Sequence, residues 1–98
     1  MPVGMLMQIP EGTQEFYDGV MEALEWESRP LPEGLIAHYA GPGENGWTVF
    51  DVWESEEAFG RFVEERLGPA VQQVMPDAPQ IAPQFIPIHN QLRTPAHA

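Results

Sequence analysis

Two side chains near the middle of the 98-residue chain could move a proton: His38 and Asp51. Each lies in an apolar run typical of a β-strand, residues 34–41 (GLIAHYAG) and 46–55 (GWTVFDVWES), and the PGEN segment between the two runs is typical of a turn. A carboxylate beside a histidine fixes the tautomer of the imidazole and raises its basicity. We therefore interpret His38 and Asp51 as candidate catalytic residues, with His38 as a general base near neutral pH.

The pairing of the two strands decides whether these side chains meet. If Gly41 lies opposite Gly46 across a four-residue turn, His38 faces Val49, and Asp51 lies on a diagonal of the same face, within reach of a contact or a bridging water. One face then carries Ile36, His38, Ala40, Trp47, Val49, Asp51 and Trp53, and the other carries Leu35, Ala37, Tyr39, Thr48, Phe50 and Val52. A slip of one residue would exchange the faces of one strand, so this prediction depends on the register.

Aromatic side chains around the pair predict where a substrate would lie. The candidate substrate-binding residues are Trp47, Trp53, Tyr39, Phe62 and His89. The two tryptophans offer flat walls for an aromatic molecule. Tyr17 or Tyr39 could donate a hydrogen bond to a developing oxyanion, although packing is the simpler role for both.

Each candidate also has a structural interpretation. Asp51 could simply accept hydrogen bonds from a tryptophan N–H, a tyrosine or a backbone amide, and His38 could be a half-buried core residue with satisfied hydrogen bonds. Trp47 is next to the turn and could cap one end of the sheet, whereas Trp53 suits the core or an interface. His89 could be an ordinary polar residue at a strand end. The sequence leaves both interpretations open.

The order of the predicted elements is β-α-β-β-α-β. Strands are expected at residues 3–9, 34–41, 46–55 and 82–90, and helices at residues 14–28 and 56–67. Ser55 suits the N-cap of the second helix, and Gly68 with Pro69 is expected to interrupt that helix before a short further piece. This order is that of an α+β, ferredoxin-like fold, with one four-stranded antiparallel sheet and two helices on one face.

Two prolines in the last strand indicate its place in the sheet. Pro83 and Pro87 lie four residues apart, so their missing amides fall on the same side of the strand, which an edge strand tolerates. The usual strand order of this motif, 4-1-3-2, places the last strand at an edge. We expect a single domain over residues 1–90 and a flexible C-terminal tail over residues 91–98.

The predicted sheet has large apolar side chains on both faces, but two helices can cover only one of them. The other face would leave an exposed apolar patch too large for a monomer. We therefore expect a homodimer in which two sheets pack face to face, with the helices outside, as a dimeric α/β barrel.

Composition excludes several classes of function. The formal net charge is −11, and no lysine is present, which argues against nucleic acid and anionic membrane as partners. The chain has no cysteine, no signal-like or membrane-spanning segment, and no phosphate-binding, flavin or nicotinamide fingerprint. His38 and His89 are expected on opposite edges of the sheet, so a metal site built on both is not favoured. We expect a cytoplasmic protein without cofactor or metal.

The stretch GWTVFDVWESEEAFGRF, with the element order and the length, resembles the dimeric α/β-barrel superfamily. Within it, the sequence is most similar to the antibiotic-biosynthesis-monooxygenase-like group, where a strand ending in W-E/D-S runs into a helix beginning E-E/D-A-F. Residues 53–59 (WESEEAF) carry this pattern, and the resemblance covers most of residues 5–90. The superfamily includes cofactor-free monooxygenases, haem-degrading enzymes, lactone isomerases, polyketide cyclases and proteins with no known activity.

The resemblance implies oxygenation of a phenol-like or anthrone-like substrate without a cofactor. We expect an enzyme of this kind, acting on an aromatic or polycyclic small molecule with His38 as the base. A second hypothesis is a cofactor-free cyclase or isomerase that uses the same base. A third is a dimeric binding or accessory protein with a hydrophobic pocket and no turnover. Contact between His38 and Asp51 beside an open pocket would favour the first two.

Overall fold

The computed structural model describes residues 2–78 and 81–92, so residues 93–98 of the predicted tail lie outside the described residues. The elements are β1 (Val3–Pro10), α1 (Gln14–Ala23), β2 (Leu35–Gly43), β3 (Gly46–Trp53), α2 (Glu56–Phe62), the π-helical turn η1 (Val63–Leu67), α3 (Gly68–Val74) and β4 (Gln84–Pro87). Their order confirms the predicted β-α-β-β-α-β arrangement. The last strand is shorter than the predicted span of residues 82–90.

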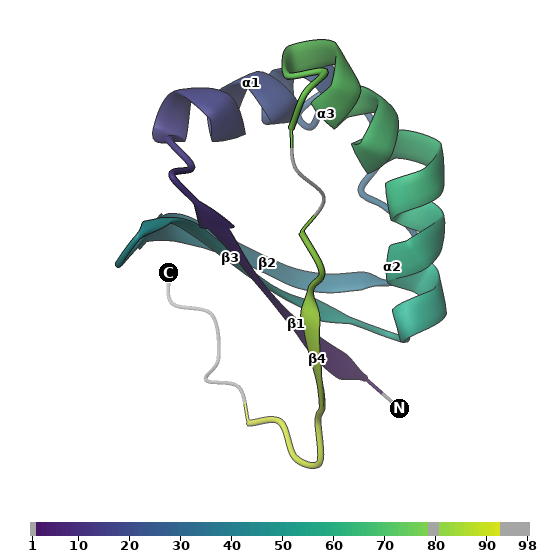
Figure 1. Ribbon diagram of the computed structural model, residues 1–98. Coiled ribbons are helices and arrows are strands. Elements are labelled where there is room, and N and C mark those ends of the chain that lie inside the picture. The colour runs from purple at the N-terminus through teal and green to yellow at the C-terminus, as the bar shows by residue number, and fades with distance from the viewer. Residues whose placement is uncertain (1, 79–80, 93–98) are drawn as a thin grey trace, which may run out of the picture.

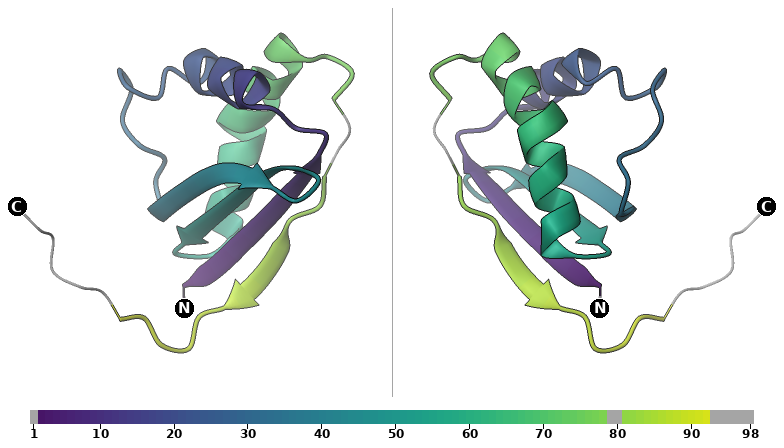
Figure 2. Two further views of the ribbon diagram at one scale, coloured as in Figure 1. Left: turned by 90° about the vertical axis from the view of Figure 1, so that its left-hand side faces the viewer. Right: turned by 90° about the vertical axis from the view of Figure 1, so that its right-hand side faces the viewer.

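The four strands form one antiparallel sheet in the order β2-β3-β1-β4, which confirms the predicted strand order. All helices lie on one face of this sheet, and the opposite face carries no helix (Figure 1, Figure 2). β4 is an edge strand and ends at Pro87, so the missing amide of this proline interrupts no interior ladder. The architecture is therefore the α+β, ferredoxin-like one expected from the sequence.

The β2–β3 hairpin has a tighter turn than the sequence predicts. Gly43 pairs with Gly46, so the predicted pairing of Gly41 with Gly46 is wrong by two residues. Pro42, expected in the turn, is a strand residue opposite Trp47. The ladder tolerates this proline because β2 is the other edge strand, where a missing outward amide costs no hydrogen bond.

The corrected register changes the relation between the two candidate catalytic residues. A shift of two residues leaves His38 and Asp51 on their predicted common face, because strand side chains alternate with a period of two. His38 lies directly opposite Asp51, and the predicted pairing of His38 with Val49 is wrong. The two side chains are thus nearest cross-strand neighbours instead of diagonal ones.

A β-bulge near the start of β2 changes the face of one apolar residue. Leu35 pairs with Trp53 and Ala37 pairs with Val52, so Ile36 is an extra residue without a partner on β3. Leu35 packs against the core under the helices, on the face opposite to the predicted one. The prediction was wrong because it assumed an unbroken period of two.

Helix α1 ends at Ala23, before the predicted end at residue 28. The chain reverses through Glu25, whose φ is 56°, and the Trp26 N–H donates to the Met21 carbonyl oxygen at 3.2 Å. This is the Schellman ending, in which a residue in the left-handed region lets the chain turn back over the last helical turn. The ending fixes the start of the α1–β2 loop, which carries Trp26.

The second helical region is continuous from α2 through η1 to α3 (Figure 1). The Ser55 hydroxyl oxygen accepts a hydrogen bond from the Ala58 N–H at 3.1 Å, which confirms the predicted N-cap. The expected interruption at Gly68 and Pro69 is only a π-helical turn, in which the Gly68 N–H donates to the Val63 carbonyl. Because a proline has no N–H for the usual bond one turn back, the wider turn accommodates it without ending the helix.

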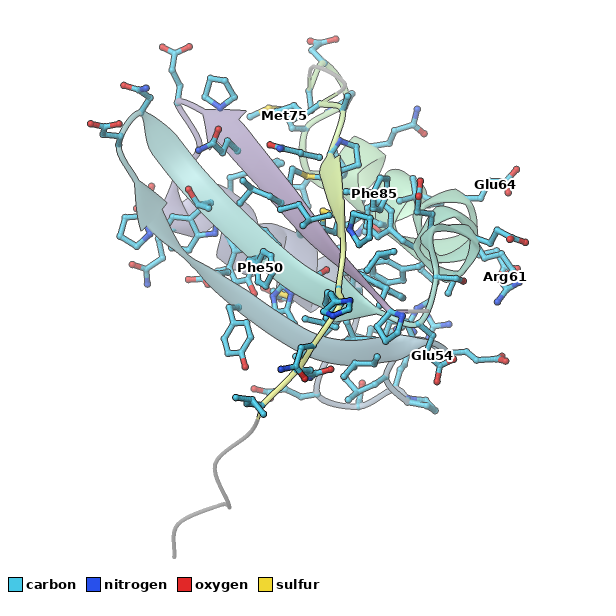
Figure 3. The ribbon with its side chains drawn as sticks, turned by 90° about the horizontal axis from the view of Figure 1, so that it is seen from below. Phe50, Glu54, Arg61, Glu64, Met75 and Phe85 are labelled. Carbon is cyan, nitrogen blue, oxygen red and sulfur yellow. The ribbon has the colours of Figure 1, made fainter. Side chains whose placement is uncertain are left out.

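The two faces of the sheet differ in what covers them. The core between sheet and helices contains Met5, Val20, Leu24, Trp53, Ala58, Phe59, Phe62 and Ala70. On the opposite face, Phe50 lies over the middle of the sheet (Figure 3), and a side chain at Gly4 would come within 3.1 Å of its ring. Tyr39, the cross-strand partner of Phe50, is 63% exposed on this open face.

Candidate active site

Four side chains from three elements form a continuous chain of hydrogen bonds between the sheet and helix α1. The Tyr17 hydroxyl lies 2.6 Å from the His38 Nε2, and the His38 Nδ1 lies 2.6 Å from the Asp51 Oδ1. The Trp53 Nε1–H donates to the Asp51 Oδ2 at 3.0 Å. Helix α1 supplies the tyrosine, β2 the histidine, and β3 the last two residues.

Asp51 is the only charged side chain in the core among the described residues, at 5% exposure. A carboxylate in such a place must be hydrogen-bonded, and each of its oxygens has one partner. One oxygen faces His38, as a catalytic pair requires, and the other accepts from a tryptophan N–H, as the structural interpretation proposed. The two interpretations of Asp51 are therefore compatible, because each uses a different oxygen.

The hydrogen-bond partners fix the tautomer of the His38 ring. A carboxylate can only accept, so Nδ1 carries the hydrogen and donates it to Asp51. In a neutral imidazole the other nitrogen is then an acceptor, so the Tyr17 hydroxyl donates to Nε2. The basic nitrogen of His38 therefore points away from Asp51 and toward Tyr17.

Tyr17 remains a neutral phenol at physiological pH. Burial raises the pKa of Tyr17 above the ordinary value of 10.0, and the negative charges of Asp51 and Asp18 raise this pKa further. The Tyr17 ring is parallel to the His38 ring within 5° and packs at 5.4 Å from the Trp47 ring. The Tyr17 hydroxyl is therefore a protonated hydrogen-bond donor in a fixed position, and not a phenolate.

The hydrogen-bonded residues border a cavity of about 100 Å³ between the sheet and the helices. Apart from Tyr17, His38 and Asp51, the lining is apolar or aromatic. The lining consists of Met5, Met7, Ile9, Phe16, Tyr17, Val20, Met21, Leu24, Trp26, His38, Val49, Asp51, Trp53, Phe59, Phe62, Leu67 and Val71. Engineered apolar cavities of about 150 Å³ hold a benzene molecule, so this cavity has about two thirds of the volume that accommodates one ring.

The α1–β2 loop contributes Trp26 to the lining of the cavity. The Trp26 ring lies 5.5 Å from the His38 ring, centre to centre. Arg66 from η1 holds this loop, because its Nη1 donates to the Pro30 carbonyl at 3.1 Å and its Nη2 to the Leu24 carbonyl at 3.3 Å. Arg66 of the π-helical turn is thus hydrogen-bonded to the segment around the Schellman ending of α1, and this segment carries Trp26.

Three of the predicted substrate-binding aromatic residues lie near His38 and Asp51, but their contacts differ. Trp53 and Phe62 line the cavity, and their rings lie 5.4 Å apart. Trp53 is fully buried and also holds Asp51, so it is a core residue as well as a wall. Trp47 is not part of the lining and reaches the site through its contact with Tyr17; its buried Nε1 has no hydrogen-bond partner.

Two predicted substrate-binding residues are not in this cavity. Tyr39 follows His38 in the strand, so its side chain projects from the opposite face of the sheet. His89 lies just after β4 and is exposed. The structure therefore does not bring Tyr39 or His89 to the site formed by His38 and Asp51.

Sequence reasoning gave too little weight to Tyr17 and missed Trp26. Tyr17 lies at helical spacing from the buried residues Val20 and Leu24, so its direction toward the sheet was readable from the sequence. Trp26 carried no such signal, because its direction depends on the left-handed backbone at Glu25.

Within residues 2–78 and 81–92, no group of three or more His, Cys, Asp or Glu side chains could hold a metal ion. No helix in the same part is long and apolar enough to cross a membrane. His38 and the His89 segment lie at opposite edges of the sheet, because β2 and β4 are its outer strands.

Comparison with known proteins identifies solved structures of similar fold. No family model and no curated protein matches the sequence. SnoaB, a cofactor-independent oxygenase from Streptomyces nogalater, is 12% identical with a TM-score of 0.59, over 95% of this chain and 97% of that chain. A candidate antibiotic biosynthesis monooxygenase from Bacteroides thetaiotaomicron is 17% identical with a TM-score of 0.64, over 96% of both chains.

A third solved structure adds information about assembly. A dimeric ferredoxin-like protein of unknown function from Thermobifida fusca is 15% identical with a TM-score of 0.61, over 90% of this chain and 92% of that chain. Identities this low establish the fold and leave the activity open. The chain has the ferredoxin-like α+β fold of the antibiotic-biosynthesis-monooxygenase-like structures, as its sequence resemblance indicated.

Proposed function

We propose that the protein is a cofactor-independent enzyme that removes a proton from a small aromatic molecule and thereby prepares it for oxygenation. The observation that carries this proposal is the 2.6 Å hydrogen bond between His38 Nδ1 and Asp51 Oδ1 at the wall of an apolar cavity. The carboxylate stabilises the imidazolium that forms when the histidine takes up a proton. The likeness of the fold to SnoaB, a cofactor-independent oxygenase, supports the same proposal.

The cavity supports a substrate that is apolar apart from one ionisable hydroxyl. The polar groups at the wall are a tyrosine, a histidine and a buried carboxylate, and the rest of the lining is hydrocarbon, thioether or aromatic ring. A phenol, quinol or enol has this character. The cavity volume favours a substrate of no more than one ring, which would require a small widening of the cavity, and a polycyclic substrate would require a much larger opening.

The chemistry after deprotonation would need little from the protein. A phenolate or enolate is electron-rich and can transfer electrons to dioxygen. A phenol that loses its hydroxyl hydrogen and one ring hydrogen, and gains one oxygen atom at that ring carbon, becomes a quinone, and the second oxygen atom leaves as water with these two hydrogens. The enzyme would deprotonate, orient and exclude bulk water. A cofactor-free isomerase or cyclase would use the same deprotonation without oxygen, and the His38–Asp51 contact favours it equally.

We also propose that the helix-free face of the sheet is the interface of a homodimer. Two described residues of this face, Tyr39 and Ile86, are 63% and 44% exposed, and Phe50 lies between them in the sheet. An apolar face of this kind is typical of a protein–protein interface. The similar fold of the dimeric ferredoxin-like protein from Thermobifida fusca supports the same arrangement.

Oxygen uptake with a panel of single-ring phenols, quinols and enols tests the proposed function. We expect oxygen consumption in the wild-type protein and its loss in His38→Gln, with His89→Gln as the matched control because His89 is exposed and outside the site. Deprotonation without oxygen consumption, seen as exchange of a substrate carbon-bound hydrogen with deuterium oxide, would support the isomerase or cyclase instead. Equal turnover by His38→Gln and the wild type would contradict both.

A further inference from the structure

We propose that Tyr17 is the catalytic residue that touches the substrate, and that it relays the substrate proton to His38. This inference deepens the proposed function and rests on it. It concerns which atom receives the proton first. The substrate it fits is a small-molecule phenol or enol, whose hydroxyl would donate to the Tyr17 oxygen.

The first step of the argument is the occupancy of the basic nitrogen. The His38 Nε2 has a single lone pair, and the Tyr17 hydroxyl already donates to it at 2.6 Å. His38 Nδ1 is equally engaged with Asp51. A substrate could therefore reach the imidazole directly only by displacing Tyr17.

The second step is the capacity of the Tyr17 oxygen. A phenol hydroxyl has one donor hydrogen and acceptor lone pairs, and its hydrogen is used toward His38. The oxygen can therefore still accept a hydrogen bond, and Tyr17 belongs to the lining of the cavity. A substrate hydroxyl in the cavity would find an acceptor at Tyr17 and none at the imidazole.

The proton balance of the relay is simple. The substrate O–H breaks and its proton bonds to the Tyr17 oxygen, while the Tyr17 O–H breaks and its proton bonds to His38 Nε2. Tyr17 is a neutral phenol before and after, the substrate becomes an anion, and His38 becomes an imidazolium beside the Asp51 carboxylate. No charge remains on the tyrosine at any stage, which suits a side chain whose ionised form is disfavoured by burial.

The rest of the site holds the relay in line. The Tyr17 and His38 rings are parallel within 5°, and Trp47 and Trp26 pack against one ring each. The Trp53 Nε1–H holds the second oxygen of Asp51, so the carboxylate cannot rotate freely away from the imidazole. Each proton-carrying group therefore has a fixed neighbour on both sides.

The ionisation of a bound chromophoric phenol tests the relay without a known substrate. 4-Nitrophenol is a single-ring phenol whose anion is yellow, so its absorbance reports the bound fraction that has lost its proton. We expect the ratio of phenolate to phenol in the bound state to fall about tenfold or more in Tyr17→Phe, which corresponds to one unit of pKa. Tyr39→Phe, on the opposite face, should leave the ratio unchanged.

The outcomes separate the relay from the proposed function. If 4-nitrophenol binds and His38→Gln lowers its ionised fraction, but Tyr17→Phe leaves this fraction unchanged or raises it, the substrate contacts His38 directly and the relay is wrong. If the probe does not bind the wild type, or if its ionised fraction ignores His38→Gln, the proposed function is wrong and the relay with it.

A second measurement tests the relay even if the Tyr17→Phe protein does not fold. Incorporation of 3-fluorotyrosine in the Tyr39→Phe background changes the acidity of Tyr17 and keeps its shape. The chain has two tyrosines, so this protein carries the label at Tyr17 alone. A relay requires the deprotonation rate of the oxygen-consuming or exchange reaction to change with fluorination, and an unchanged rate would overturn it.

Discussion

His38 and Asp51 are directly opposite each other on β2 and β3, and the imidazole Nδ1 lies 2.6 Å from the carboxylate Oδ1. This relationship depends on the hairpin register, because a pairing that places these residues opposite each other brings their Cβ atoms closer than a diagonal placement does. It also orients the site, since a histidine that donates from Nδ1 presents Nε2 to Tyr17 and to the cavity side of the sheet.

Replacing Asp51 by asparagine should lower activity, and it should also lower stability because one amide oxygen cannot accept from both the His38 Nδ1–H and the Trp53 Nε1–H. Asparagine keeps an oxygen that can accept from the His38 Nδ1–H, but it has no charge to stabilise the imidazolium. We expect the rate of substrate deprotonation to fall about a hundredfold or more, within the usual range for general acid–base catalysis. Steady-state kinetics would measure this fall, with Asp77→Asn as the control because Asp77 is exposed. An Asp51→Asn protein of unchanged activity would assign Asp51 a structural role only.

The Tyr17 hydroxyl should lose its proton only at unusually high pH. Burial first, and then the charges of Asp51 and Asp18, raise the pKa of Tyr17 above 10.0. Ultraviolet titration of the Tyr39→Phe variant would follow Tyr17 alone, because the chain has two tyrosines. We expect the pKa of Tyr17 to fall when Asp51→Asn is added. A Tyr17 that titrates like free tyrosine would contradict the burial of its hydroxyl.

The same pKa shift makes the protein less stable in alkali. The folded state holds the Tyr17 proton more tightly than the unfolded state, so the contribution of Tyr17 to stability is fully present below pH 10.0. It is lost as the pH rises through the higher pKa of the folded state. Urea denaturation at a series of alkaline pH values should show a steeper loss of unfolding free energy in the Tyr39→Phe protein than in a protein that also carries Tyr17→Phe.

Replacing Trp53 by phenylalanine should destabilise the protein partly through Asp51. The substitution keeps an aromatic ring but removes the Nε1–H that donates to the Asp51 Oδ2, which leaves a buried oxygen without its donor. We expect a loss of about 1–3 kcal/mol from this oxygen alone, in addition to the loss from the smaller ring. Trp47→Phe is the matched control, because the Trp47 Nε1 has no hydrogen-bond partner. Equal losses in urea denaturation would show that the Asp51 bond contributes nothing.

Glycine at position 25 should stabilise the protein. Glu25 has a φ of 56°, in the left-handed region that glycine adopts without a steric cost. We expect Glu25→Gly to raise the free energy of unfolding by up to about 1 kcal/mol, after allowance for the more flexible unfolded chain. Glu27→Gly, in the same loop but without a positive φ, should destabilise or have no effect. Thermal melting of the two variants would decide, and a destabilised Glu25→Gly would contradict the Schellman ending.

A charge on the helix-free face should separate the proposed dimer. Phe50 lies over the middle of this face (Figure 3), so Phe50→Glu would place a carboxylate at the centre of the interface. We expect the wild type to sediment as a dimer and the variant as a monomer, because an unpaired buried charge is costly. Gln73→Glu adds the same charge at an exposed position of α3 and should remain dimeric. A monomeric wild type would refute the homodimer directly.

The sequence by itself determined the element order, the edge position of the last strand and the common face of His38 and Asp51. These features follow from local chemistry: prolines limit a strand to an edge, a serine followed by acids starts a helix at Ser55, and alternation places His38 and Asp51 on one face. A two-residue error in the register did not disturb them, because a shift of two preserves the faces.

The direct contact and the surroundings of the pair were decided only by the tertiary structure. The register depended on whether Pro42 could join an edge strand, and the bulge at Ile36 depended on how the strand fits its neighbour. Tyr17 reaches His38 because α1 packs over the sheet, and Trp26 reaches it because Glu25 adopts a left-handed backbone. Contacts between elements distant in sequence have no local period that encodes them, so the hydrogen bond of Tyr17 to His38 depends on where the helices pack on the sheet.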